Sequence, residues 1–218
     1  MITIFQHGED EEPGIIREFL NTHRIPWKTC RFYKGDNAPY TLPEHLILLG
    51  GSMSVNNAED YPYFAAEKAI VREMIKGNRP VLGICLGAQL IASASGQPVR
   101  KGPREIGWAS INGCVPEWRG VFPETFPVFQ WHEETFNLPP GSTLLAKGHM
   151  VKNQAFRLGS AVGVQFHPEV TEKIIATWAR DVPDDVKRAL LEESDRMREE
   201  NRARCNALLS LFLRGWTL

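Results

Sequence analysis

The stretch that most constrains the fold of this chain is "RPVLGICLGAQLIASASG", residues 79–96. A short apolar run ends in Cys85, which lies between Gly83 and Gly87, and a helical pattern follows directly. A nucleophile at a sharp strand-to-helix turn needs small neighbours, because the backbone is strained there and larger side chains would clash. Free N–H groups and the helix dipole at such a turn favour thiolate over thiol. The pattern predicts a nucleophilic cysteine, although the pentapeptide alone fits a buried structural cysteine equally well.

Strand and helix patterns alternate along the first half of the chain. The apolar runs predict four strands, at residues 1–6, 27–33, 45–51 and 81–85. Helical periodicity predicts three helices, at residues 14–22, 61–76 and 86–96. In the second of these, Pro62 lies near the first turn and Gly77 acts as the stop signal. This order indicates βαβ units and a mostly parallel sheet, the arrangement of an α/β protein.

The second half is richer in Gly and Pro and contains further short strand-like runs. They lie at residues 107–113, 125–132, 142–146 and 161–166, and we expect them to extend the sheet, in part with antiparallel strands. Residues 183–213 predict a long C-terminal helix that packs on the sheet, with a partner-binding helix as the alternative. Its apolar face contains Val186, Leu190, Met197, Cys205, Leu208 and Phe212. Without repeats or linkers, residues 1–218 are expected to form a single domain.

Composition excludes several classes of function. The formal net charge of −1 gives no electrostatic reason to expect nucleic acid or a membrane surface as a partner. The four cysteines are far apart and form no C-x-x-C pair, which argues against disulfides and a zinc site. No apolar run reaches the ~18 residues of a membrane helix, and the N-terminus lacks the features of a signal peptide. We therefore expect a cytoplasmic protein without a metal.

A base for the cysteine is predicted in "VGVQFHPEV", residues 162–170. An apolar run ends there in His167, Pro168 and Glu169. In an extended backbone, residues i and i+2 point to the same side, so Glu169 can reach His167 and fix its tautomer. The proline prevents helix at His167, and the end of a strand is where α/β sheets carry their sites. Cys85, His167 and Glu169 are therefore predicted to form a catalytic triad.

Two further segments fit a cysteine hydrolase. "LLGGSMSVNN" ends a buried strand with two glycines, and a backbone N–H of such a loop can stabilise an oxyanion. We favour Gly51 as this donor, with the N–H of Leu86 as the second, although a plain tight turn explains the glycines equally well. Gln89 lies one helical turn after Cys85 and could reach a polar substrate. Taken alone, Gln89 is expected to be a solvated helix residue.

Together these segments resemble the class I glutamine amidotransferases of the triad type. The resemblance rests on "GICLGAQ", "QFHPE" and "LLGGSMSV", which occur in the order typical of the family; "QWHEETFNLPPG" is also similar to the segment between the two halves of the triad. Ser52 replaces the proline that the family usually has in its glycine loop. The whole sequence is most similar to free-standing members that resemble the glutamine domain of GMP synthase.

The resemblance implies a fold, a reaction and a set of roles. The fold is a flavodoxin-like, three-layer α/β sandwich around a mostly parallel sheet. The reaction hydrolyses the side-chain amide of glutamine through a γ-glutamyl thioester on Cys85, and the main chain around Trp131 joins Gln89 in holding the substrate. No cofactor is needed. We expect no synthetase domain in these 218 residues, which implies that ammonia passes to a separate synthetase partner.

Other functions use the same residues. A stand-alone hydrolase of γ-glutamyl peptides or amines would have the same triad and thioester but a different leaving group. Trp131 and His132 are bulky enough to line the leaving-group side, although a core aromatic and a surface histidine explain them equally well. A binding protein that lost the chemistry is disfavoured by the intact triad. The combination of His-Pro-Glu with "GAQ" disfavours another cysteine hydrolase of the wider α/β superfamily.

Overall fold

The computed structural model describes residues 1–218, and its centre is a nine-stranded sheet in the order β2-β1-β3-β4-β9-β8-β7-β5-β6. The strands are β1 (Ile2–Gln6), β2 (Trp27–Arg31), β3 (His45–Leu48), β4 (Val81–Ile84), β5 (Val99–Gly113), β6 (Phe126–Phe136), β7 (Thr143–Lys147), β8 (Asn153–Leu158) and β9 (Ala161–Val164). From β2 to β9 neighbouring strands are parallel, and the remaining pairs are antiparallel. The mostly parallel sheet with an antiparallel extension agrees with the sequence pattern.

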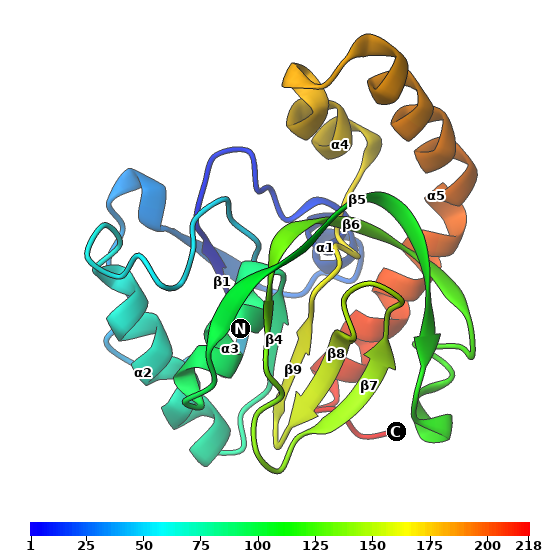
Figure 1. Cartoon of the computed structure of the whole chain (residues 1–218). Coiled ribbons are helices and arrows are strands. Elements are labelled where there is room, and N and C mark those ends of the chain that lie inside the picture. The colour runs from blue at the N-terminus through cyan, green and yellow to red at the C-terminus, as the bar shows by residue number, and fades with distance from the viewer.

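Helices cover both faces of this sheet (Figure 1). The helices are α1 (Gly14–Thr22), α2 (Tyr63–Lys76), α3 (Leu86–Ala94), α4 (Glu172–Trp178) and α5 (Asp184–Leu213). One hydrophobic cluster joins α1 and the C-terminal half of α5 to one face, and a second cluster joins α2 and α3 to the other. The predicted three-layer α/β sandwich is confirmed. None of the helices has both the length and the apolar composition needed to cross a bilayer.

The long antiparallel pair β5 and β6 curves over one end of the sheet (Figure 1). Its register shifts between Lys101 and Glu105, and such an irregularity bends a strand and increases its twist. Both strands are longer than their apolar runs suggest, because the extension of β5 at residues 99–106 is mostly exposed or half-buried and that of β6 begins with two glutamates. This pair supplies a wall of the cleft described below.

Three details differ from the sequence-based expectations. Strand β8 was not predicted, because "NQAFRL" has only a short apolar centre. The expected strand at residues 27–33 ends at Arg31, and a 3₁₀ turn, Phe32–Lys34, follows. Val186 is 43% exposed rather than packed, because the first turns of α5 extend with α4 beyond the sheet (Figure 1). The rest of the predicted C-terminal helix packs on the sheet through Cys205, Leu208 and Phe212.

Strand β4 and helix α3 pack together through Gly83 and Gly87. A Cβ added to Gly83 would lie 2.5 Å from the backbone carbonyl of Gly87, and a Cβ added to Gly87 would overlap the carbonyl oxygen of Leu48 in β3. The two glycines therefore let α3 begin directly against the sheet. The turn between β4 and α3 consists of one residue, Cys85.

We predict that Gly87→Ala lowers the free energy of unfolding by about 1–3 kcal/mol, the usual cost of overpacking a core. Helix propensity alone predicts the opposite sign, a gain of about 1 kcal/mol. Urea denaturation measures the difference. Gly120→Ala is the matched control, because nothing lies within 4 Å of its added Cβ, and it should leave stability unchanged. A stabilised Gly87→Ala variant would contradict the packing argument.

Candidate active site

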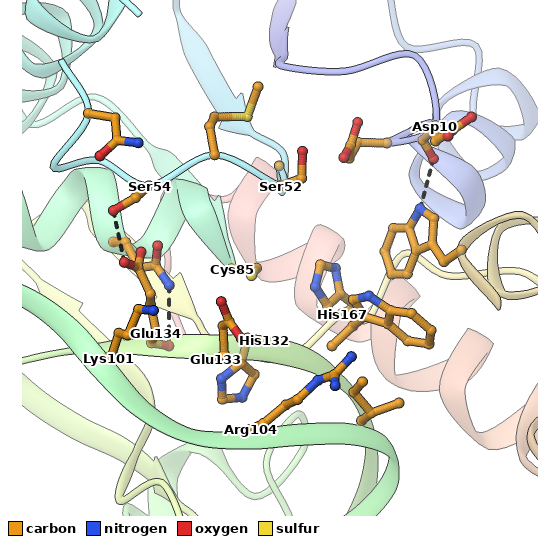
Figure 2. A pocket seen from close by; sticks show the side chains of 18 of the residues that line it. Asp10, Ser52, Ser54, Cys85, Lys101, Arg104, His132, Glu133, Glu134 and His167 are labelled. Carbon is orange, nitrogen blue, oxygen red and sulfur yellow. Dashed lines mark hydrogen bonds between the residues drawn. The ribbon is translucent and has the colours of Figure 1, made fainter. Parts of the chain in front are cut away.

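A cleft of about 820 Å³ brings together most of the residues singled out from the sequence. Cys85, Gly51, Gln89, Trp131 and His167 all line it, and Figure 2 shows the sulfur of Cys85 beside the imidazole of His167. The cleft lies at the carboxyl ends of the central parallel strands, where α/β proteins usually bind ligands. Glu169 and Leu86 adjoin the cleft. Glu169 is hydrogen-bonded to the imidazole of His167, and Leu86 packs beside Gly51.

Cys85 occupies a strained backbone conformation between β4 and α3. Its φ of 49° and ψ of −105° lie where residues other than glycine are rarely found. The turn is held on both sides, because the Cys85 N–H donates to Val164 O at 2.8 Å and Cys85 O accepts from the N–H of Gln89 at 3.0 Å. The sulfur is thus fixed at the N-terminus of α3.

His167 and Glu169 form a buried pair next to the cysteine. His167 Nδ1 donates to Glu169 Oε1 at 2.8 Å, and both side chains are 3% exposed. The edge-on ring of Trp178 packs against the imidazole, with 4.8 Å between ring centroids. The buried Nε2 has no hydrogen-bond partner, which leaves it available to the sulfur or a substrate. The i, i+2 spacing on either side of Pro168 therefore produces the expected contact.

The charge state of His167 depends on its two neighbours. Burial by itself lowers the pKa of this imidazole, but the negative charges of Glu169 and Cys85 outweigh burial and raise the pKa to about 10. The site therefore favours the imidazolium form of His167 at neutral pH. This arrangement combines a nucleophile with a proton donor, as nucleophilic catalysis by cysteine requires.

Gln165 contacts the nucleophile and was missed by the sequence analysis. Its Nε2 donates to Cys85 Sγ at 3.6 Å, and its side chain is fully buried. A signal was present, because Gln165 lies two residues before His167 in the apolar run, and residues at this spacing in an extended run are expected on the same side.

The two glycines after β3 lie against the reactive groups. A Cβ added to Gly50 would lie 2.9 Å from His167 Cε1 and 3.7 Å from Cys85 Cβ. A Cβ added to Gly51 would lie 2.6 Å from Leu86 Cδ2. A side chain at Gly50 would press on the imidazole of His167, so this glycine permits a close approach and does not serve only a turn.

The remaining predicted residues form walls of the cleft. Gln89 is buried, with Nε2 donating to Glu134 O at 3.4 Å, so the expectation of a solvated helix residue is wrong. Trp131 stacks on Phe129 and packs against Trp178. His132 is not a surface histidine: it is 8% exposed. Its Nε2 lies 3.1 Å from Glu105 Oε2, which fixes the ring in the cleft wall.

Comparison with known proteins shows the family of the chain. Residues 18–177 match the family model described as "Glutamine amidotransferase class-I". The chain belongs to this family. The resemblance identified from the sequence motifs is confirmed, as is the flavodoxin-like fold.

Similar proteins match most of the chain. The putative glutamine amidotransferase-like protein YfeJ of Salmonella typhimurium is 30% identical, over 97% of this chain and 95% of its own length. A glutamine-hydrolyzing GMP synthase subunit of Sulfolobus acidocaldarius is 38% identical, over 62% of this chain and 73% of its own. The crystal structure of a glutamine amidotransferase from Thermotoga maritima, 30% identical, superposes with a TM-score of 0.90 over 97% of this chain and 96% of that one.

We predict that Cys85→Ala lowers the pKa of His167. The variant removes the sulfur charge that raises this pKa, while the burial that lowers it remains. An NMR pH titration of the His167 imidazole measures the change. Cys114→Ala is the control, because this half-buried cysteine does not line the cleft. Equal His167 pKa values in the wild type and Cys85→Ala would contradict an effect of Cys85 on the charge of His167.

Proposed function

We propose that this amidotransferase hydrolyses the side-chain amide of glutamine to glutamate and ammonia, through a γ-glutamyl thioester on Cys85. The observation that carries the proposal is the strained Cys85 at the start of α3, in one cleft with the buried His167–Glu169 pair. Family membership supports the same reaction.

In the first half-reaction the Cys85 thiolate attacks the amide carbon, after His167 has taken the thiol proton. The carbonyl oxygen becomes an oxyanion, and the backbone N–H groups of Gly51 and Leu86 are the proposed donors to it. Each such donor typically contributes about 3 kcal/mol. The carbon–nitrogen bond then breaks, and His167 gives its proton to the departing ammonia. The γ-glutamyl group stays on the sulfur as a thioester.

In the second half-reaction water replaces the sulfur. His167 removes a proton from the water, which attacks the thioester carbonyl, and the same oxyanion donors stabilise the tetrahedral intermediate. Collapse releases glutamate and returns the thiolate–imidazolium pair. Glu169 holds Nδ1 of His167 throughout, which keeps Nε2 directed at the reacting atoms.

Substrate binding and the fate of ammonia complete the proposal. Gln89 and the main chain around Trp131 line the cleft near Cys85 and are proposed to hold the α-amino and carboxylate end of glutamine. The proposed steps need neither a metal nor an organic cofactor. The GMP synthase subunits among the similar proteins support delivery of ammonia to a separate acceptor enzyme.

The size of the cleft favours a second candidate function. Its volume of about 820 Å³ is in the upper range for sites that bind drug-sized ligands, and glutamine is much smaller than these. Charged side chains, among them Lys101, Arg104 and Glu133, line the outer part (Figure 2). A γ-glutamyl peptide or amine would use this space for its leaving group while the same triad performs the chemistry.

The first test is glutamate release by the purified chain from glutamine, γ-glutamyl dipeptides and γ-glutamyl amines. The amidotransferase proposal predicts slow turnover of glutamine and nothing better, whereas fast turnover of one γ-glutamyl compound would establish the hydrolase. Cys85→Ser should abolish turnover in either case, because a serine at this position is a much weaker nucleophile. Its thermal melt should match that of the wild type. Full activity in Cys85→Ser would exclude the nucleophile.

A second test concerns the orienting carboxylate. Glu169→Gln should lower kcat about 10²- to 10⁴-fold with little change in KM, because the amide stabilises the wrong tautomer of His167. Steady-state kinetics on the best substrate of the panel measures both constants. Glu133→Gln, on the cleft wall, is the matched control and should act mainly on KM. An unchanged kcat in Glu169→Gln would remove Glu169 from the triad.

A further inference from the structure

A second buried histidine–glutamate pair lies behind the glycine loop and has no role in the steps above. His7 directly follows β1, and its Nε2 lies 3.0 Å from Oε1 of Glu67 in α2. Its Nδ1 lies 3.1 Å from the carbonyl oxygen of Gly50. Both side chains are completely buried. The imidazole thus joins α2 to the loop that adjoins Cys85.

The surroundings of this pair are unfavourable for charge. The rings of Phe32, Tyr63 and Phe64 surround His7, with centroids 6.1–6.3 Å away. Burial lowers the pKa of His7, but the charge and hydrogen bond of Glu67, followed by the Gly50 carbonyl and Glu11, raise it above its usual value. Burying such a pair is costly and often adds no stability compared with apolar residues.

The contact with Gly50 constrains the next peptide group. A carbonyl oxygen only accepts, so Nδ1 of His7 must carry the proton and donate. In a planar trans peptide, the C=O of Gly50 and the N–H of Gly51 point in opposite directions. Since His7 holds the carbonyl on the buried side, the Gly51 N–H is turned toward the cleft that Gly51 lines. It has no backbone acceptor there.

A Gly-Gly segment needs such a constraint. Glycine has access to far more backbone conformations than other residues, so the Gly50–Gly51 peptide could rotate unless something holds it. Its position matters, because Gly50 lies against both Cys85 and His167. The carbonyl of Gly50 has one protein partner, His7.

We infer that His7, held by Glu67, is a positioning residue that fixes the Gly50–Gly51 peptide so that the Gly51 N–H faces the oxyanion formed on Cys85. The inference rests on the proposed function for its catalytic consequence. His7 touches neither the substrate nor the reacting atoms. It acts through the orientation of one peptide group.

Two substitutions separate the two hydrogen bonds of His7. In His7→Asn the side-chain amide nitrogen lies near the position of Nδ1 and can still donate to Gly50 O. In His7→Gln it lies near the position of Nε2, which keeps the bond to Glu67 and loses the one to Gly50. We expect His7→Gln to lower kcat about 10- to 100-fold with KM nearly unchanged, somewhat less than the ~10²–10³-fold effect of removing an oxyanion donor. His7→Asn should restore most of the lost kcat.

A stability control accompanies these variants. Met74→Ala creates a cavity on the buried face of α2, and Met74 does not line the cleft, so the variant should lower the melting temperature and leave kcat unchanged. A role of His7 in stability alone predicts that kcat follows the melting temperature across all three variants. Equal kcat values in His7→Gln and His7→Asn, or a loss confined to KM, would overturn the inference.

A structural measurement separates this inference from the proposed function. If the wild type releases no glutamate from any γ-glutamyl compound, the proposed function fails. The orientation of the Gly50–Gly51 peptide in crystal structures of His7→Gln and His7→Asn still tests whether His7 positions this peptide. We expect the carbonyl to turn away from residue 7 in His7→Gln and to keep its direction in His7→Asn. An unchanged peptide in His7→Gln would overturn the inference.

Discussion

The direct packing of Gly83 in β4 against Gly87 in α3 determines where the sulfur of Cys85 lies. Without side chains at these positions, the helix starts against the sheet and the connecting turn is reduced to a single strained residue. Hydrogen bonds to Val164 and from Gln89 hold that turn from both sides. The backbone therefore fixes the sulfur at a helix N-terminus, and the other groups of the site are arranged around it.

Two buried histidine–glutamate pairs lie on either side of the Gly50–Gly51 segment. His167 lies against the Cα of Gly50, and His7 donates to its carbonyl. Each imidazole has a carboxylate, Glu169 or Glu67, that favours its protonated form despite burial. Uncompensated charges would be very costly in such an interior, so each pair remains together and its geometry is well defined. One pair belongs to the proposed proton transfers, and the other constrains the backbone beside them.

The fold and much of the site could be predicted because their signals are local. Buried apolar runs and helical periodicity indicated the parallel strands and the helices, and the i, i+2 spacing of His167 and Glu169 indicated their contact. The polar strand β8 and the extensions of β5 and β6 had weaker signals, since pairing with neighbouring strands and not apolar content stabilises them. The sequence also did not indicate the burial of Gln89, because this burial depends on a contact with Glu134 in the distant strand β6.

The sequence by itself determined the α/β class, the strained cysteine between two glycines and the histidine–carboxylate pair, since each depends on residues only a few positions apart. Only the tertiary structure decided that these segments meet in one cleft, that the amide of Gln165 reaches the sulfur, and that His7 joins Glu67 to Gly50. Those contacts join residues that are 43 to 80 positions apart. No local sequence pattern encodes contacts between residues so far apart in the chain, because such contacts are set by the order of strands in the sheet and by the helices packed on it.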